Sequence, residues 1–450
     1  MLHFSVRSLG KLICNMLLAL TVACGTAVTA TAKDNLFAGA QTLELEQLIE
    51  LVQARNADLE AARAGAEEAA TRIKSAGALE DPMLSYKLAP ATIGSREIGT
   101  RQGVEVSQTL PWPGTLHARE AKAKAEAEAA QNDTSMRTLE VVSDAKAAFA
   151  EWVFIYAALK INRQHQIHLG DLEAAAERSY ATGVGRQQDA LKASLELARV
   201  ENEALGLESQ RRMVQARINA LLNRAPVAEL PEPTPFRLLT RLPPLDHLGT
   251  MAMARHPELK GLEATLDSTE AVVALARKAF YPDLSVQAGY DEMWDAKEMR
   301  PSVGISFNVP LHWERREAEL ASARAAQRRA EWKVADRRAT LLAAVAEAYA
   351  SVDQAARSIA LYKERLLPLA DAAVLAALAD YRLGTGGFSS VIDAERSKLD
   401  QQLSLERAIA DQYRSLAALE QAIGGPLVEA DSEVGSPASN GAIDHREYRP

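Results

Sequence analysis

The sequence predicts a mostly helical chain that contains one module twice, each copy combining a pair of short strands with a pair of long helices. Three observations lead to this fold class. Only 5% of the 450 residues are aromatic, which is typical of long helices in close contact rather than of one thick core. Two stretches alternate between apolar and polar residues, as amphipathic strands do. Each is followed by a long region that is poor in proline and rich in helix-forming residues.

Residues 1–32 have the order of an export signal. Arg7 and Lys11 are followed by an apolar run over Leu12–Val22, which is too short to span a membrane. Ala30-Thr31-Ala32 then provides the small residues of a cleavage site. These features predict a signal peptide and an exported mature chain.

Cys24 offers a second processing site, because its small neighbours resemble the cleavage site of a lipoprotein. Thr21 stands where leucine is usual, so cleavage after Ala32 is the first expectation. Cys14 and Cys24 are the only cysteines of the sequence. A chain cleaved after Ala32 therefore has no disulfide and no thiol chemistry.

The first copy of the module is organised around a strand that ends in a proline-rich corner. Residues 41–75 have apolar side chains at helical spacing and predict one helix. Strands with one apolar and one polar face are predicted over 83–89 and 104–110. Beyond the corner, residues 115–224 contain no proline and predict two long helices joined by a turn at Tyr180–Gly185.

The same elements return in the second half. Matching residues stay within one position of an offset of about 200: Ala54–Leu59 with Ala254–Leu259, Pro82 with Pro282, Ser107 with Ser306, Tyr180 with Tyr381 and Gly183 with Gly384. Strands are predicted over 284–290 and 303–309, and Pro368 is expected to bend the second long helix. Such a constant offset across different elements predicts an internal duplication.

The chain is thus predicted to divide into four parts after the signal peptide. The first repeat covers residues 33–224, a proline-rich extended linker covers 225–244, and the second repeat covers 245–425. Residues 426–450 combine Gly, Ser and Pro with mixed charge and predict a disordered tail.

Four two-faced strands in one chain need partners. One interpretation is a small soluble sheet whose apolar face packs on a helix. The export signal and the small, weakly charged polar faces favour the other, an outer-membrane β-barrel. Four strands cannot close a barrel, which needs about eight, and unpaired edges are not tolerated in lipid. Several chains must then contribute to one barrel.

A set of motifs, in the same order in both halves, carries a resemblance to a known family. They are Asn56-Ala-Asp-Leu59, His256-Pro-Glu-Leu259, Asp81-Pro82, Tyr281-Pro282-Asp283, Ser107-Gln-Thr-Leu-Pro-Trp-Pro-Gly114, Ser306-Phe-Asn-Val-Pro-Leu311 and the two Tyr-x-x-Gly turns. Through them, residues 41–424 resemble the TolC family of outer-membrane efflux proteins. The resemblance implies a homotrimer with a 12-strand β-barrel in the outer membrane and a 12-helix barrel in the periplasm.

The resemblance also implies two helix-hairpin tips that meet a periplasmic adaptor protein. The tip residues in this sequence are Tyr180, Gly183, Tyr381 and Gly384. Because family members are exit ducts of tripartite machines, the implied partners are this adaptor, an inner-membrane pump of the RND type and outer-membrane lipid.

A gate is implied just behind the tips. Family members often carry Asp six and nine places after the second tip glycine, where this chain has Ser390 and Asp393. Asp393 keeps the match and Ser390 departs from it, while Asp189 lies six places after the first tip glycine. A ring of Asp393 side chains would attract cations at a constriction; the alternative is an ordinary solvated Asp.

Other functional classes find little support. The net charge of −9 gives no reason to expect a nucleic acid. No nucleophile–base pair, phosphate loop or zinc motif indicates an enzyme, and no cofactor is expected. The Pro-Trp-Pro-Gly corner is similar to that of heavy-metal efflux members, yet Met83, Met293, Met299 and His312 form no metal-ligand cluster.

The sequence therefore predicts an outer-membrane channel that exports small molecules or metal ions. Two alternatives stay open. One is the outer-membrane component of a type I protein secretion system. The other is a periplasmic coiled-coil scaffold without a pore.

Overall fold

The computed structural model describes residues 36–37, 41–94, 99–236, 242–294 and 296–427. The predicted signal peptide, both cysteines and the tail beyond residue 427 lie outside these ranges. The chain divides after Ala40 into two units, and the second, from Gln41 onward, contains the helices and strands of the described chain.

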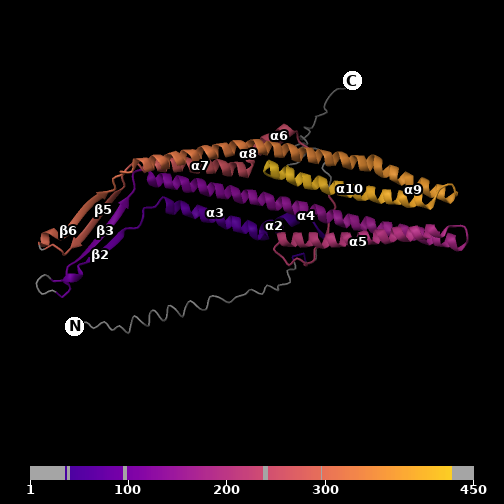
Figure 1. Ribbon diagram of the computed structural model, residues 1–450, viewed down its shortest axis with the longest axis horizontal. Coiled ribbons are helices and arrows are strands. Elements are labelled where there is room, and N and C mark those ends of the chain that lie inside the picture. The colour runs from indigo at the N-terminus through magenta and orange to yellow at the C-terminus, as the bar shows by residue number, and fades with distance from the viewer. Residues whose placement is uncertain (1–35, 38–40, 95–98, 237–241, 295, 428–450) are drawn as a thin grey trace, which may run out of the picture. The chain divides into compact units, whose positions relative to one another are not determined.

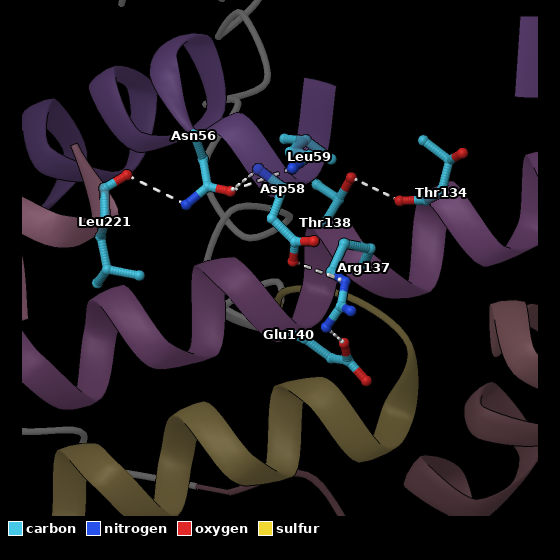
Figure 2. Close-up of polar contacts among 8 residues, drawn as sticks. All are labelled: Asn56, Asp58, Leu59, Thr134, Arg137, Thr138, Glu140 and Leu221. Atoms are coloured by element: carbon cyan, nitrogen blue, oxygen red, sulfur yellow. Dashed lines mark hydrogen bonds and ion pairs between the residues drawn. The ribbon is translucent and has the colours of Figure 1, made fainter. Parts of the chain in front are cut away.

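The first helical segment is two helices and not one. α2 spans Leu45–Arg55 and α3 spans Ala57–Ala76, with Asn56 between them. The Asn56 side-chain oxygen accepts hydrogen bonds of 3.1 Å from the backbone N–H groups of Asp58 and Leu59, and its amide donates to the Leu221 carbonyl at 3.1 Å (Figure 2). The predicted single helix over 41–75 is therefore wrong, because a capping side chain starts a second helix at Asn56.

The second repeat breaks at the matching residue. α6 spans Leu245–Arg255 and α7 spans Pro257–Lys278, separated by His256. Pro257 occupies the first position of α7, where its missing N–H leaves no hydrogen bond unmade. The same break in both repeats shows that the duplication extends to the helix ends.

Four strands form one antiparallel sheet in the order β2-β3-β5-β6, drawn at one end of the helices in Figure 1. Their bounds are β2 Met83–Leu88, β3 Gln102–Leu110, β5 Leu284–Asp291 and β6 Pro301–Phe307, with the short 3₁₀ turns Pro90–Thr92 and Lys297–Met299 in the loops. The pairing of β3 with β5 joins the two repeats, and β2 and β6 are the outer strands.

The sheet has one apolar face. Val104 lies opposite Tyr290, Val106 opposite Ala288, and Val286 opposite Ile305, so apolar side chains meet across neighbouring strands. The alternate positions hold mostly serine, threonine, glutamine and glycine, together with Met83, Lys87, Glu105 and Asp291. The apolar side chains are exposed in the single chain, with Val303 at 82%. No element of the described chain therefore covers this face.

A proline corner connects the sheet to the helices. The rings of Trp112 and Tyr281 stack with centroids 4.7 Å apart. The Trp112 backbone N–H donates to the Asp283 carboxylate at 3.0 Å, and Gly114 precedes α4 with a φ of +83° that favours glycine. These contacts join the corner of the first repeat to that of the second.

Long helices follow each corner. In the first repeat they are α4 Thr115–Ala181 and α5 Gln187–Leu221; in the second they are α8 Trp313–Leu361, α9 Leu367–Arg382 and α10 Phe388–Ile423. A π-helical turn, η3 Tyr362–Leu366, separates α8 from α9. Pro368 is the second residue after it, and the turn accommodates the backbone bond that proline cannot make.

The helices pack side by side in a fixed order. Near the sheet α3 packs on α4, α4 on α7, and α7 on α8; farther away α5 packs on α4, α4 on α10, and α10 on α8 and α9 (Figure 1). Separate clusters of buried residues hold this arrangement together, one of them near the helix tips. Among the described residues, no helix combines the length and apolar character needed to cross a membrane.

The linker is more than extended chain. Within it β4, Glu232–Pro233, pairs in parallel with β1, Thr42–Leu43. The Leu43 side chain is fully buried, and its carbonyl accepts a hydrogen bond from the Thr234 backbone N–H at 3.0 Å. The start of the first repeat is thus fastened to the segment between the repeats.

Candidate functional site: the helix tips and the layer behind them

The first tip is a tight turn between α4 and α5. The Gly183 N–H donates to the Tyr180 carbonyl at 2.9 Å, and the Gly185 N–H donates to the Ser179 carbonyl at 2.9 Å. Gly183 has a φ of +77°, a backbone conformation that residues with a Cβ rarely adopt. Tyr180 is half exposed and Val184 is 84% exposed, so the turn presents side chains to the outside.

The second tip, between α9 and α10, repeats this geometry. The Gly384 N–H donates to the Tyr381 carbonyl at 3.1 Å, the Gly386 N–H donates to the Asp380 carbonyl at 3.0 Å, and Gly384 has a φ of +73°. Leu383 is 77% exposed. The four predicted tip residues therefore occupy matching places in two similar turns.

Asp189 of the first repeat lies close enough to Tyr381 of the second for its charge to act on the phenol. Asp189 lies in the first turn of α5 and is 8% exposed. Burial raises the pKa of the Tyr381 phenol above its ordinary value, and the negative charge of Asp189 raises this pKa further. Tyr381 also packs edge-on against Phe388, with centroids 5.2 Å apart. Asp189 is thus held between the two repeats rather than on an open surface.

Asp393 and Ser390 lie on the first turns of α10 and are both exposed. The charge of Asp393 contributes to a raised pKa of Arg396, after the larger effect of the Glu196 carboxylate. The structure therefore places Asp393 beside the charged groups that link α5 to α10. Among the described residues, no side-chain hydrogen bond joins Asp393 or Ser390 to Asp189.

An ion pair behind the tips was missed by sequence reasoning. Arg396 on α10 donates from Nε and Nη2 to the two carboxylate oxygens of Glu196 on α5, with Nε to Oε1 at 3.0 Å. The Glu196 side chain is only 6% exposed. One turn nearer the tip, Lys192 donates to the Ser389 hydroxyl. These contacts fasten the first repeat to the second.

Farther from the tips, the interior holds titratable side chains. His165 on α4 is 3% exposed, and burial, together with the charges of His168 and Lys398, lowers its pKa. Glu395 on α10 is 9% exposed, and burial raises its pKa. Amphipathic spacing alone could not reveal these residues, because they replace apolar side chains at core positions.

The described part of the chain contains no group of three or more His, Cys, Asp or Glu side chains arranged to hold a metal ion. The tips combine two glycine turns, the Tyr381–Phe388 aromatic pair within the second repeat and the Glu196–Arg396 ion pair between the repeats.

Comparisons with known proteins decide the family. The sequence pattern that defines the family described as "Outer membrane efflux protein" matches residues 48–224 and matches again over residues 248–425. The chain belongs to the outer membrane efflux protein family. Its location is therefore the outer membrane, with the long helices on the periplasmic side, as predicted.

Individual relatives are distant. The cobalt-zinc-cadmium resistance protein CzcC of Cupriavidus metallidurans is 24% identical over 251 residues, which cover 56% of this chain and 59% of CzcC. The match therefore spans less than two thirds of that protein's length.

Solved structures share the fold over most of the chain. The outer-membrane channel OprN is 21% identical with a TM-score of 0.73, covering 85% of this chain and 90% of its own. VceC from Vibrio cholerae is 21% identical with a TM-score of 0.73, covering 85% of this chain and 96% of its own. These findings confirm the predicted fold of the chain, which is duplicated and mostly helical and carries a four-stranded sheet.

Proposed function

We propose that three copies of this chain form the exit duct of a tripartite efflux system. The observation that carries the proposal is the uncovered apolar face of the four-stranded sheet, whose outer strands β2 and β6 have no further partner among the described residues. Lipid covers such a face, and neighbouring subunits pair such edges. Membership of the outer membrane efflux protein family supports the assignment of this face to the lipid of the outer membrane.

The same proposal assigns partners. The exposed turns around Gly183 and Gly384 dock a periplasmic adaptor, and an inner-membrane pump of the RND type supplies the energy. The chain itself catalyses no reaction and uses no cofactor. Asp189, Ser390 and Asp393 lie at the narrow mouth, where Asp393 favours cations.

The cargo is a small molecule or a metal ion. Similarity to a cobalt-zinc-cadmium resistance protein supports divalent metal ions. Deletion of the gene in its native host tests this point, because loss of tolerance to cobalt, zinc and cadmium would support metal export. Loss of drug tolerance alone would support small organic cargo, and loss of a secreted protein would support the type I system.

Reconstitution into planar lipid bilayers tests the channel itself. Discrete conductance steps from the purified protein are the expected result. If no steps occur at any protein concentration, while the protein is folded and trimeric, the chain is a scaffold without a pore.

A further inference from the structure

The contact between the two repeats inside the chain can be compared with the helix surfaces that remain uncovered at the edges of the chain. Inside the chain, α4 of the first repeat packs on α7 of the second. Gly261 on α7 faces α4 closely, since a Cβ built on it would lie 3.4 Å from the Asn132 Cβ and 3.8 Å from the Ala129 carbonyl oxygen. Small residues on α7 therefore allow α4 to approach.

Matched ion pairs fix the register of the duplication in these helices. The Arg137 Nε on α4 lies 2.9 Å from an Asp58 carboxylate oxygen on α3. The Arg337 Nη2 on α8 lies 2.6 Å from a Glu258 carboxylate oxygen on α7. The arginines of the two ion pairs are 200 positions apart, and so are their acidic partners. Therefore α3 corresponds to α7, and α4 to α8, residue by residue.

One strip on α3 is uncovered although its copy on α7 is buried. The buried strip on α7 is Pro257, Gly261, Ala264 and Ser268, and the exposed strip at the matching positions of α3 is Ala57, Ala61, Ala64 and Glu68. The difference arises because α4 covers α7, whereas no helix of the described chain covers this side of α3.

α8, at the other edge of the chain, also has an uncovered strip, whereas the matching strip of its copy α4 is covered. On α4, Ala129 and Asn132 lie against Gly261 of α7, and helical spacing extends this strip to Ala118 and Ala125, all four buried or half-buried. The matching strip on α8 is Ala318, Ala325, Arg329 and Trp332, all exposed. Trp332 is 74% exposed. A tryptophan at the position of a half-buried contact residue marks a surface that another helix covers.

The two uncovered strips are complementary in charge. Arg329 stands where the internal template has Ala129, and Glu68 stands where the template has Ser268. α3 runs toward the sheet and α8 runs away from it. In an antiparallel pairing, Glu68 and Arg329 therefore both lie on the sheet side of the Ala61–Trp332 contact.

We infer that Trp332 and Arg329 of one subunit lie against Ala61, Ala64 and Glu68 of the next subunit. The occupant of the α3 strip is a second copy of this chain. The inference rests on the proposed trimer and adds the residues that join it. The small side chains of α3 leave room for the indole, and the Arg329–Glu68 pair distinguishes this junction from the one inside the chain.

Disulfide cross-linking in outer membranes tests the contact. The test variant carries Ala61→Cys with Trp332→Cys, and oxidation is expected to link subunits into dimers and trimers on denaturing, non-reducing gels. Gly261→Cys with Asn132→Cys is the matched control, because the same geometry then links one chain to itself. Ala61→Cys with Arg338→Cys should stay unlinked, since Arg338 binds Glu263 on its own α7 at 2.7 Å.

The outcomes separate the inference from the proposed function. In one outcome the trimer is intact and the control pair oxidises, but the Ala61–Trp332 pair links no more than either single-cysteine variant. This result overturns the contact without contradicting the proposed channel. If the unaltered protein forms no trimer, the proposed function fails first.

Charge reversal gives a second measurement. Arg329→Glu is expected to lower the temperature at which the trimer dissociates, and Glu68→Arg in the same chain is expected to restore it. An equal decrease in both single variants with no recovery in the double variant would contradict the Arg329–Glu68 pair.

Discussion

At the residue scale, Asn56 and His256 occupy the same position in the two repeats and act differently. Asn56 accepts two backbone hydrogen bonds at the start of α3. His256 is 1% exposed and makes no side-chain cap at the start of α7. Burial lowers its pKa to about 4, and the nearby charge of Arg337 contributes to the decrease. His256 is therefore neutral in the folded protein at neutral pH.

This difference predicts a pH dependence of stability. An unfolded histidine binds a proton near pH 6.5, whereas folded His256 does so only near pH 4. Protonation therefore favours unfolding, and stability should decrease as the pH falls from about 6.5 toward 4. In His256→Asn this contribution disappears. Thermal unfolding across that pH range measures the effect, and identical pH slopes in both proteins would contradict it.

Asp393 predicts an ion preference. Its exposed carboxylate lies near the tip end of α10, where three copies would create a negative ring in the proposed trimer. Asp393→Ala should reduce the preference for cations over anions. The reversal potential in a salt gradient measures this preference, with Asp353→Ala on α8 as a control remote in sequence. An unchanged potential in Asp393→Ala would exclude this carboxylate from the constriction.

At the element scale, the contacts between α5 and α10 determine how firmly the tips are held. Among the described residues, Arg396→Ala would leave the buried carboxylate of Glu196 with only the more distant Arg199, at 3.5 Å. Since Arg396 is itself 40% exposed, we expect a loss of about 2 kcal/mol, below the range for a fully buried pair.

The functional expectation for Arg396→Ala is a wider opening at the tips and a larger single-channel conductance. Arg315→Ala is the matched control, because the Arg315–Glu319 pair is exposed and contributes little. Equal conductance in the Arg396 variant and the unaltered channel would show that this ion pair does not hold the tips closed.

The sheet makes a separate prediction. Ile305 lies on the apolar face and Ser306 on the polar face of β6. Ile305→Arg should destabilise the barrel by about 2–4 kcal/mol if the residue lies near the centre of the bilayer, whereas Ser306→Arg faces the interior and should be tolerated. The amount of heat-modifiable trimer measures both. Normal trimer in Ile305→Arg would reverse the assigned faces.

The sequence predicts those elements that depend on residues close together in the chain. Alternation located the strands, and the Tyr-x-x-Gly turns located both tips. The break at Asn56 was missed because one capping side chain outweighs the helix propensity of its neighbours. The Glu196–Arg396 pair was missed because the contact depends on how two helices, 200 residues apart, lie beside each other, which spacing within one helix does not determine.

At the scale of the whole molecule, the single chain is incomplete at both edges. β2 and β6 are the outer strands, and the exposed large apolar residues include Leu191 and Leu195 on α5 and Leu375 on α9. A head-to-tail arrangement of identical subunits covers one kind of edge with the other, and closure into a ring leaves none exposed.

We therefore expect purified protein to be trimeric in detergent. Light scattering coupled to size exclusion should give three times the mass of the mature chain after subtraction of the detergent. A folded monomer that stays in solution without detergent would contradict the covered sheet face and the closed ring together.

The two tip turns have a consequence for any docking partner. A ring of three subunits displays tip turns of two alternating kinds with nearly the same backbone. One turn exposes Val184 and the other exposes Leu383. To an approaching protein this is a quasi-equivalent surface with twice the rotational order of the channel. Identical adaptor copies would therefore occupy two classes of site with unequal affinity, and filling should proceed in two steps as their concentration rises.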